Sequence, residues 1–297
     1  MSIEIYAVAV GFLLLFAVFD LIVGVSNDAV NFLSSSIGSR VASVRVILLV
    51  ASLGLLCGVL FSNGMMEVAR KGIFHPQYFT MPELVSLFTA VMLADILILD
   101  LFNTYGLPTS TTVSIVFELL GAAAAIALMK VVASDGGISD IGHYINSAKT
   151  LSIVFGILLS VIVAFAAGAV VQFFARLSFT FDYQSNLSRW GGVWGGLAIA
   201  SISLFIMLKG AKGAAFLSAD DVAWIQTHSL SILSGTFVAA AIVFQVLCSF
   251  FQVNVLKPIV LIGTFALALA FAANDLVNFI GVPLAGLESY KAALLSA

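Results

Sequence analysis

The sequence predicts an all-α integral membrane protein, a polytopic bundle of apolar helices. Of 297 residues, 62% are hydrophobic and only 9% are charged, against roughly 25% charged residues in ordinary soluble domains. The mean hydropathy is +1.17. Apolar runs of about 20 residues, the length that crosses a bilayer, recur along the chain. We therefore expect a multi-pass protein of the inner or plasma membrane.

The elements follow in order as eight candidate spans. The first, 5–25, is expected to be a retained helix, because no positive charge precedes it and no small-residue cleavage site stands out. The other seven cover residues 41–63, 84–102, 113–130, 149–175, 190–208, 228–251 and 255–273. The pair 84–102 and 113–130 either crosses twice or forms a re-entrant helical hairpin, and we expect the hairpin. No soluble domain is present, so residues 1–297 form a single transmembrane domain.

The net charge and the two cysteines argue against a nucleic acid partner and against a disulfide or zinc framework. The net charge of −3 is small and provides no basic face, so no nucleic acid partner is expected. Cys57 and Cys248 both lie in apolar runs and do not resemble a disulfide or zinc framework. We expect the lipid bilayer around the chain and no cofactor apart from a transported ion.

An internal repeat is the most informative feature. Residues 27–32, Asn-Asp-Ala-Val-Asn-Phe, recur at 274–279 as Asn-Asp-Leu-Val-Asn-Phe, an offset of 247 residues. An even number of crossings separates the copies whether or not the hairpin spans, so the two motif helices enter the membrane in opposite directions. Many secondary transporters have such inverted-topology repeats. We place the first repeat at about 1–145, with connecting helices and an incomplete second repeat at about 146–297.

Six carboxylates lie in or against the apolar spans, and no Lys or Arg occupies the middle of a span. Each costs about 2.5–3.5 kcal/mol at the centre of a lipid-exposed helix, so most must face the bundle interior, water or a cation. Four of them could equally be structural, hydrogen-bonded carboxyls or functional groups; these are Asp20, Asp95, Asp100 and Glu118.

Asp28 and Asp275 differ from the other four because asparagines flank each of them. Asn at −1 and +3 adds amide oxygens within one helical turn, and oxygen ligands suit hard cations. We predict a coupling-cation site, such as a Na+ site, formed by Asn27, Asp28, Asn274 and Asp275.

A polar segment between two apolar runs, residues 106–112, reads Gly-Leu-Pro-Thr-Ser-Thr-Thr. Pro108 suits the first turn of a helix, where its missing N–H costs nothing. The helix that it opens would present free N–H groups and four hydroxyls, which is an anion site. The absence of a cationic side chain favours a reversible substrate site, and the alternative is a Ser/Thr-capped turn. The hydroxyls belong to Thr109, Ser110, Thr111 and Thr112.

With these residues the chain resembles the inorganic phosphate transporter (PiT) family. Its signatures are a Gly-x-Asn-Asp-x-x-Asn-like motif occurring twice and a Pro-Val-Ser-Thr-Thr-His-like motif, matched here at 26–31, 273–278 and 108–113. The resemblance implies phosphate at Thr109, Ser110, Thr111 and Thr112, with Asn31 and Asn278 nearby. It implies Na+ or H+ at the Asn-Asp motifs. Val113 stands where the family often has His, which leaves the coupling ion open.

The family carries a second copy of the Ser-Thr-Thr motif. Ser110 follows Asp28 by 82 residues, and the same spacing from Asp275 would place that copy near residue 357, beyond residue 297. We therefore expect an N-terminal portion of a longer transporter, and we do not expect these 297 residues alone to transport.

The resulting hypothesis is a secondary active symporter for inorganic phosphate, coupled to sodium or protons through alternating access, and not an enzyme. Alternatives are a transporter of another oxyanion such as sulfate, or a non-transporting membrane assembly subunit. An intramembrane aspartyl protease built on Asp95 and Asp100 is disfavoured, because neither lies in a Gly-x-Gly-Asp context. The orientation in the membrane and a homodimer are left open.

Overall fold

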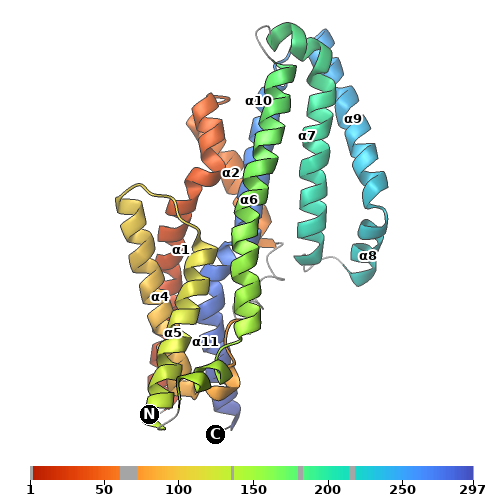
Figure 1. Ribbon diagram of the computed structural model, residues 1–297. Helices are drawn as coiled ribbons and strands as arrows, with labels where there is room; N and C mark the ends of the chain where they lie inside the picture. The colour runs from red at the N-terminus through yellow and green to blue at the C-terminus, as the bar shows by residue number, and fades with distance from the viewer. Residues whose placement is uncertain (1–2, 61–71, 135–136, 180–182, 214–217, 297) are drawn as a thin grey trace. The chain divides into compact units, whose positions relative to one another are not determined.

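The computed structural model describes residues 3–60, 72–134, 137–179, 183–213 and 218–296. In these ranges the regular elements are helices, with one isolated bridge between Phe74 and Ile145 (Figure 1). The α-helices are α1 (Ile3–Ser39), α2 (Val44–Leu60), α4 (Met81–Thr104), α5 (Thr111–Ala133), α6 (Ser147–Ser178), α7 (Tyr183–Gly213), α8 (Ala219–Thr227), α9 (Ser229–Phe250), α10 (Leu256–Asn274) and α11 (Leu276–Ser296). Short 3-10 helices lie at η1 (Pro76–Tyr78) and η2 (Ile138–His143).

Seven of the described helical stretches are long and apolar enough to cross a membrane. The predicted multi-pass, all-α fold class is confirmed. The helices α4 and α5 have 24 and 23 residues, and at about 1.5 Å per residue each exceeds the ~30 Å hydrocarbon core. The re-entrant hairpin and the inverted repeat remain predictions.

The chain forms two compact units. Unit 1 contains Met1–Val30, Met65–Ile157 and Asn274–Ala297, and unit 2 contains Asn31–Gly64 and Leu158–Ala273. In each copy of the repeated motif the unit boundary falls within or at the start of the motif, after Val30 and before Asn274.

The expectation that the first span ends near residue 25 is wrong. Helix α1 continues through Asn27 and Asp28 to Ser39. Polar residues such as Asn and Asp weaken helices mainly by bonding to nearby backbone, whereas here both side chains bond to residues far along the chain. The second copy behaves differently: α10 ends at Asn274, Asp275 forms a turn, and α11 begins at Leu276.

Unit 1 is built around an apolar core from α1, α4, α5 and α11, which includes Leu13, Leu87, Met92, Leu119 and Val282. At one end, the ammonium of Lys130 on α5 lies 2.9 Å from the carboxylate of Glu83. Glu83 also accepts the N–H of Thr80 at 2.7 Å and so completes a capping box at the start of α4. These contacts fix the register of α4 against α5.

In unit 2, α7 packs against α9 through the glycines at 191, 192, 195 and 196. A Cβ on Gly196 would lie 2.8 Å from the carbonyl oxygen of Phe237 and from the Cβ of Ala241. Gln245 on α9 donates to the carbonyl of Ser188 at 2.8 Å and accepts the N–H of Gly192 at 3.2 Å. Gln245 is therefore an interhelical hydrogen-bond partner.

A second small-residue contact joins α2 to α10 within unit 2. Gly54 and Gly58 stand four residues apart, the spacing that lets helix backbones approach closely in membranes. A Cβ on Gly54 would lie 2.5 Å from the carbonyl oxygen of Phe265, and one on Gly58 would lie 2.6 Å from the Cβ of Ala272. The two backbones are therefore in direct contact.

Gly58→Ala is expected to destabilise the protein by about 1–3 kcal/mol, the usual cost of overpacking. The added methyl would meet the backbone of Leu269, which cannot move aside like a side chain. Thermal unfolding in detergent measures the effect. Gly263→Ala on α10 is the matched control, because a Cβ there has nothing within 4 Å. An equal melting temperature for both variants would contradict the close contact.

Candidate functional site

The loop between α4 and α5 is set by a Schellman-type helix end. Gly106 has a φ of 65°, and its N–H donates to the carbonyl of Asn103 at 3.0 Å. The N–H of Leu107 donates to the carbonyl of Phe102 at 2.9 Å. Helix α5 begins only at Thr111, with Ser110 as its N-cap. The prediction that Pro108 occupies the first helical turn is therefore wrong. Pro108 lies two residues before the N-cap, because residues 107–110 connect the end of α4 to α5 without helical structure.

Asn27 holds this loop in place. Its side-chain oxygen accepts the N–H of Thr109 at 2.9 Å, and its amide donates to the side-chain oxygen of Asn103 at 2.9 Å and to the carbonyl of Leu107 at 3.1 Å. Asn103 in turn donates to the carbonyl of Val23 on α1 at 3.0 Å. Asn27 is only 5% exposed, so its amide groups are committed to the loop.

Asn27→Ala is expected to release the loop without unfolding the protein. It removes three hydrogen bonds, each worth about 1 kcal/mol, so amide hydrogen exchange at Thr109 should accelerate by roughly tenfold to a hundredfold. Mass spectrometry of the peptide that spans the loop measures this. Ser26→Ala is the control, because the Ser26 hydroxyl bonds only within its own helix, to the carbonyl of Ile22. Unchanged exchange at Thr109 would rule out the clamp.

The two aspartates of the repeated motif reach consecutive threonines at the start of α5. The hydroxyl of Thr111 donates to Asp28 at 3.1 Å, and that of Thr112 donates to Asp275 at 2.6 Å. Asn278 donates its side-chain amide to the Thr112 hydroxyl oxygen at 2.9 Å. Asp28 and Asp275 are also close enough to interact electrostatically. Three segments far apart in the sequence thus meet at one helical turn.

Negatively charged carboxylates and the partly positive N–H end of a helix lie together at this turn. Helices α1 and α4 carry no Lys or Arg, so within these two helices nothing basic offsets the carboxylates. At the same turn, the N–H of Val113 is capped by the hydroxyl of Ser110 at 3.4 Å. The N–H groups of Thr111 and Thr112 cannot reach a carbonyl within α5. Carboxylate oxygens and helix N–H groups therefore lie side by side.

Not every predicted site residue joins this cluster. Asn31 is exposed and belongs to unit 2, and the side chain of Asn274 lies outside the described part of the chain. Ser110 is exposed and Thr109 is half-buried, whereas Thr111 is 1% exposed and Asp28 is 3% exposed. The four hydroxyls differ in their contacts, because those of Thr111 and Thr112 donate to carboxylates; their role in binding an anion stays a prediction.

Two features of the cluster are not predictable from the motifs alone. Asn103 helps to hold the loop through its 2.9 Å contact with Asn27, 76 residues away. In the sequence, only its position shortly before Pro108 indicated that it could take part in the site. The structure also does not form an Asp95–Asp100 pair, since Asp95 is fully buried and Asp100 is exposed on α4. Nothing in this geometry supports an aspartyl protease dyad.

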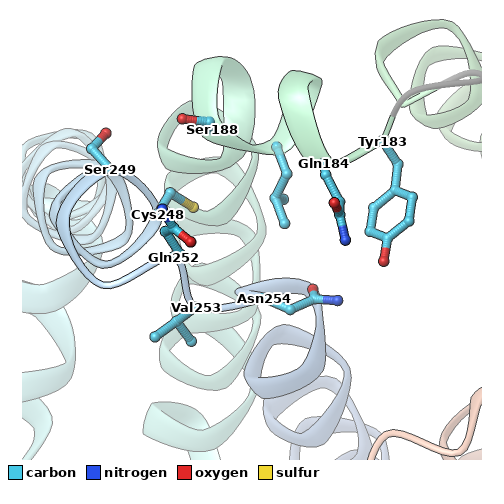
Figure 2. Close-up of a pocket in the computed structure, with 9 residues that line it drawn as sticks. Tyr183, Gln184, Ser188, Cys248, Ser249, Gln252, Val253 and Asn254 are labelled. Carbon is cyan, nitrogen blue, oxygen red and sulfur yellow. The ribbon is translucent and has the colours of Figure 1, made fainter.

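A cavity of about 340 Å³ lies in unit 2, between the start of α7 and the connection from α9 to α10. Figure 2 shows its polar lining, which includes Gln184, Ser188, Gln252 and Asn254. None of its lining residues is charged, so it does not offer the charge complementarity of the threonine cluster in unit 1.

Curated relatives resemble this chain at moderate identity. A protein of Pyrococcus abyssi, which carries the provisional name of a phosphate permease, is 27% identical over 273 residues. A similarly named protein of Thermococcus kodakarensis is 26% identical over 265 residues. Each alignment covers 86% of this chain and 61% of the relative, so the chain spans about three-fifths of the length of these relatives.

A solved structure described as the sodium-dependent phosphate transporter matches with a TM-score of 0.73 and 20% sequence identity, over 95% of this chain and 68% of that chain. This likeness concerns the fold. The sequence profile of the phosphate transporter family matches residues 24–296, which include both copies of the Asn-Asp motif and the threonine pair. The chain therefore belongs to the phosphate transporter family.

Proposed function

We propose that the protein is a secondary active symporter for inorganic phosphate, driven by sodium or protons, and that it works by alternating access. One observation carries the proposal. Asp28 and Asp275, the carboxylates of the repeated motif, bond to the consecutive hydroxyls of Thr111 and Thr112. A cation at the carboxylates would then lie next to an anion at the start of α5, and opposite charges at this distance attract strongly away from water.

The hydrogen bonds suggest how the two ligands favour each other. The Thr112 hydroxyl donates to Asp275. A cation or proton at Asp275 would replace this hydroxyl as the positive partner and free it to turn towards a phosphate oxygen. The phosphate would also accept the N–H groups of Thr111 and Thr112. Each ligand therefore raises the affinity for the other, which is the thermodynamic condition for coupling.

Contacts of the two motif copies with neighbouring residues support the inverted repeat on which alternating access would rest. Phe279, the last residue of the second copy, packs on Gly24, three residues before the first copy. Phe32, the last residue of the first copy, packs on Phe271, three residues before the second copy, with ring centroids 5.5 Å apart. Such reciprocal contacts are expected when two elements are related by a two-fold axis.

The known relatives agree with this proposal. Phosphate is named for the relatives from both archaea and for the matching structure, and sodium is named for the structure. We extend both ligands to this chain as part of the proposal. A helix N-terminus and hydroxyls discriminate weakly among tetrahedral anions, so another oxyanion such as sulfate is the second candidate substrate.

Uptake of radiolabelled phosphate into proteoliposomes that carry the full-length protein tests the proposal. Uptake should require an inward gradient of sodium or protons, and sulfate should compete weakly. Running each gradient alone identifies the driving ion. If labelled sulfate enters faster than phosphate, the substrate is another oxyanion; if neither enters under any gradient, the symporter assignment is wrong.

A further inference from the structure

Three carboxyl groups that the proposed cation and anion sites do not use meet in the core of unit 1. Asp20 on α1 and Asp95 on α4 are both 0% exposed, and Glu118 on α5 is half-buried. The apolar residues one helical turn before each of them, Ala17, Met92 and Ile115, belong to the hydrophobic core. Charged side chains in such surroundings are costly unless they are paired or neutralised.

The three carboxyls interact mainly with one another. Asp95 lies between the other two, within hydrogen-bonding range of both Asp20 and Glu118. The hydroxyl of Ser114 donates to one oxygen of Glu118 at 2.7 Å. The Ser114 hydroxyl also acts on Asp95. The other Glu118 oxygen and all four oxygens of Asp20 and Asp95 are buried, and none of them accepts a well-formed hydrogen bond among the described residues.

Among the residues that the structure describes, no positive charge pairs with this cluster. The charged groups that act on it are its own three carboxyls and Asp28, which interacts electrostatically with Asp95 and with Asp275. Helices α1 and α4 contain no Lys or Arg. On α5, Lys130 lies 12 residues beyond Glu118 and is bound to Glu83. On α11, which packs against α4 and α5, the basic residue is Lys291, 16 residues beyond Asp275.

Neighbouring ionised carboxylates repel each other and have no hydrogen to share. A proton between them turns this repulsion into a hydrogen bond, as in other buried carboxyl pairs. A metal ion fits the cluster poorly, because no group of three acidic, His or Cys side chains in the described chain converges on a point that could hold one. We propose that Asp20, Asp95 and Glu118 form a proton-binding site, distinct from the Asp28–Asp275 pair, whose proton occupancy changes during the transport cycle.

The change of proton occupancy during the transport cycle rests on the proposed symport. The position of the cluster along α1 connects it to the proposed cation site. Asp20 precedes Asp28 by eight residues on α1, which is about 12 Å along the helix. The cluster thus lies on the same helices as the candidate site. Binding of one proton converts a carboxylate to a carboxylic acid and removes one negative charge from the neighbourhood of Asp28. That loss reduces the repulsion of an anion at Thr111, so where the proton is the driving cation, phosphate entry and proton uptake are expected to occur together.

Infrared spectroscopy of the full-length protein in nanodiscs tests the site directly, because only a protonated carboxyl gives its characteristic C=O band. We expect this band at neutral pH in the unaltered protein and in the control Asp100→Asn, which changes an exposed carboxyl on α4. The band should decrease in Asp95→Asn and in Glu118→Gln. An unchanged band in both of these variants would overturn the proposal.

Labelling with a hydrophobic carbodiimide gives a second measurement, since this reagent adds to protonated carboxyls in apolar surroundings. Peptide mass spectrometry should find the label on Glu118, the most accessible of the three, and the label should decrease at alkaline pH. Asp95→Asn could fail to fold because Asp95 is fully buried, whereas the half-buried Glu118→Gln keeps the test possible. Absence of label from all three carboxyls at neutral pH would contradict the proposal.

Neither measurement uses phosphate, so its outcome is independent of the proposed transport function. Where phosphate uptake is observed, its pH dependence adds the link to the cycle. One titrating proton changes uptake by up to about tenfold per pH unit, and Glu118→Gln should flatten this profile while Asp100→Asn keeps it. An unaltered profile in Glu118→Gln would remove the cluster from the transport cycle.

Discussion

Asp275→Asn is expected to reduce phosphate uptake by the full-length protein to the background of empty liposomes, and Asp28→Asn is expected to do the same. Each replacement keeps the size of the side chain and its ability to accept a hydrogen from Thr112 or Thr111. It removes the negative charge that attracts the coupling cation. Because the two ligands raise each other's affinity, loss of the cation also removes most of the phosphate affinity.

Proteoliposome uptake measures this effect, and Asp100→Asn is the matched control. Asp100 is also a carboxylate within an apolar helix, but it is exposed and lies on the far side of α4 from the buried Asp95. Its neutralisation should leave uptake within about twofold. A membrane assembly subunit whose motifs only pack helices predicts the opposite result, namely that Asp28→Asn and Asp275→Asn leave transport intact. That result would sink the symporter proposal.

Thr112→Val is expected to raise the phosphate KM by roughly tenfold to a hundredfold. The variant keeps the shape of the side chain and removes one hydrogen bond to a charged group, worth about 1.5–3 kcal/mol. The cation concentration for half-maximal uptake should not rise, because the Thr112 hydroxyl donates to Asp275 and would compete there with the cation. A raised phosphate KM together with an unchanged cation requirement therefore distinguishes this mechanism from simple misfolding.

Uptake measured over ranges of phosphate and of coupling ion gives both values. Thr112→Ser keeps the hydroxyl and should restore the phosphate KM. Thr89→Val on α4 is the second control, since the hydroxyl of Thr89 bonds only to the carbonyl of Val85 in its own helix. If Thr112→Val instead raises the requirement for the cation and leaves the phosphate KM unchanged, the hydroxyl serves the cation and the proposed exchange of partners is incorrect.

Local sequence patterns predicted the features that depend on composition and repetition. The apolar runs predicted a helical membrane protein, and the paired Asn-Asp motifs together with the threonines predicted the residues that meet at the start of α5. Two local patterns gave wrong helix ends: the first span was expected to end near residue 25, and Pro108 was expected in the first turn of a helix. Helix α1 continues through Asn27 and Asp28 because their hydrogen-bond partners, such as Leu107 and Thr111, lie about 80 residues away.

Tertiary proximity also explains why the sequence could not separate the remaining acidic residues. Asp95 and Asp100 have the same local surroundings in the sequence, an apolar run rich in Leu and Ile. They differ because α4 turns Asp95 into the core, towards Asp20 and Glu118, and leaves Asp100 exposed. Such a difference depends on which helices are neighbours, and composition and spacing do not determine this.

Thr111 and Thr112 follow each other directly, so their side chains project about 100° apart around the axis of α5. Each is held by one aspartate, and the two aspartates lie 247 residues apart in the sequence. Any rotation of α5 about its own axis would lengthen at least one of these bonds. The first turn of α5 is therefore restrained against rotation from two directions. In the proposed mechanism, a cation at either aspartate would release one of these restraints.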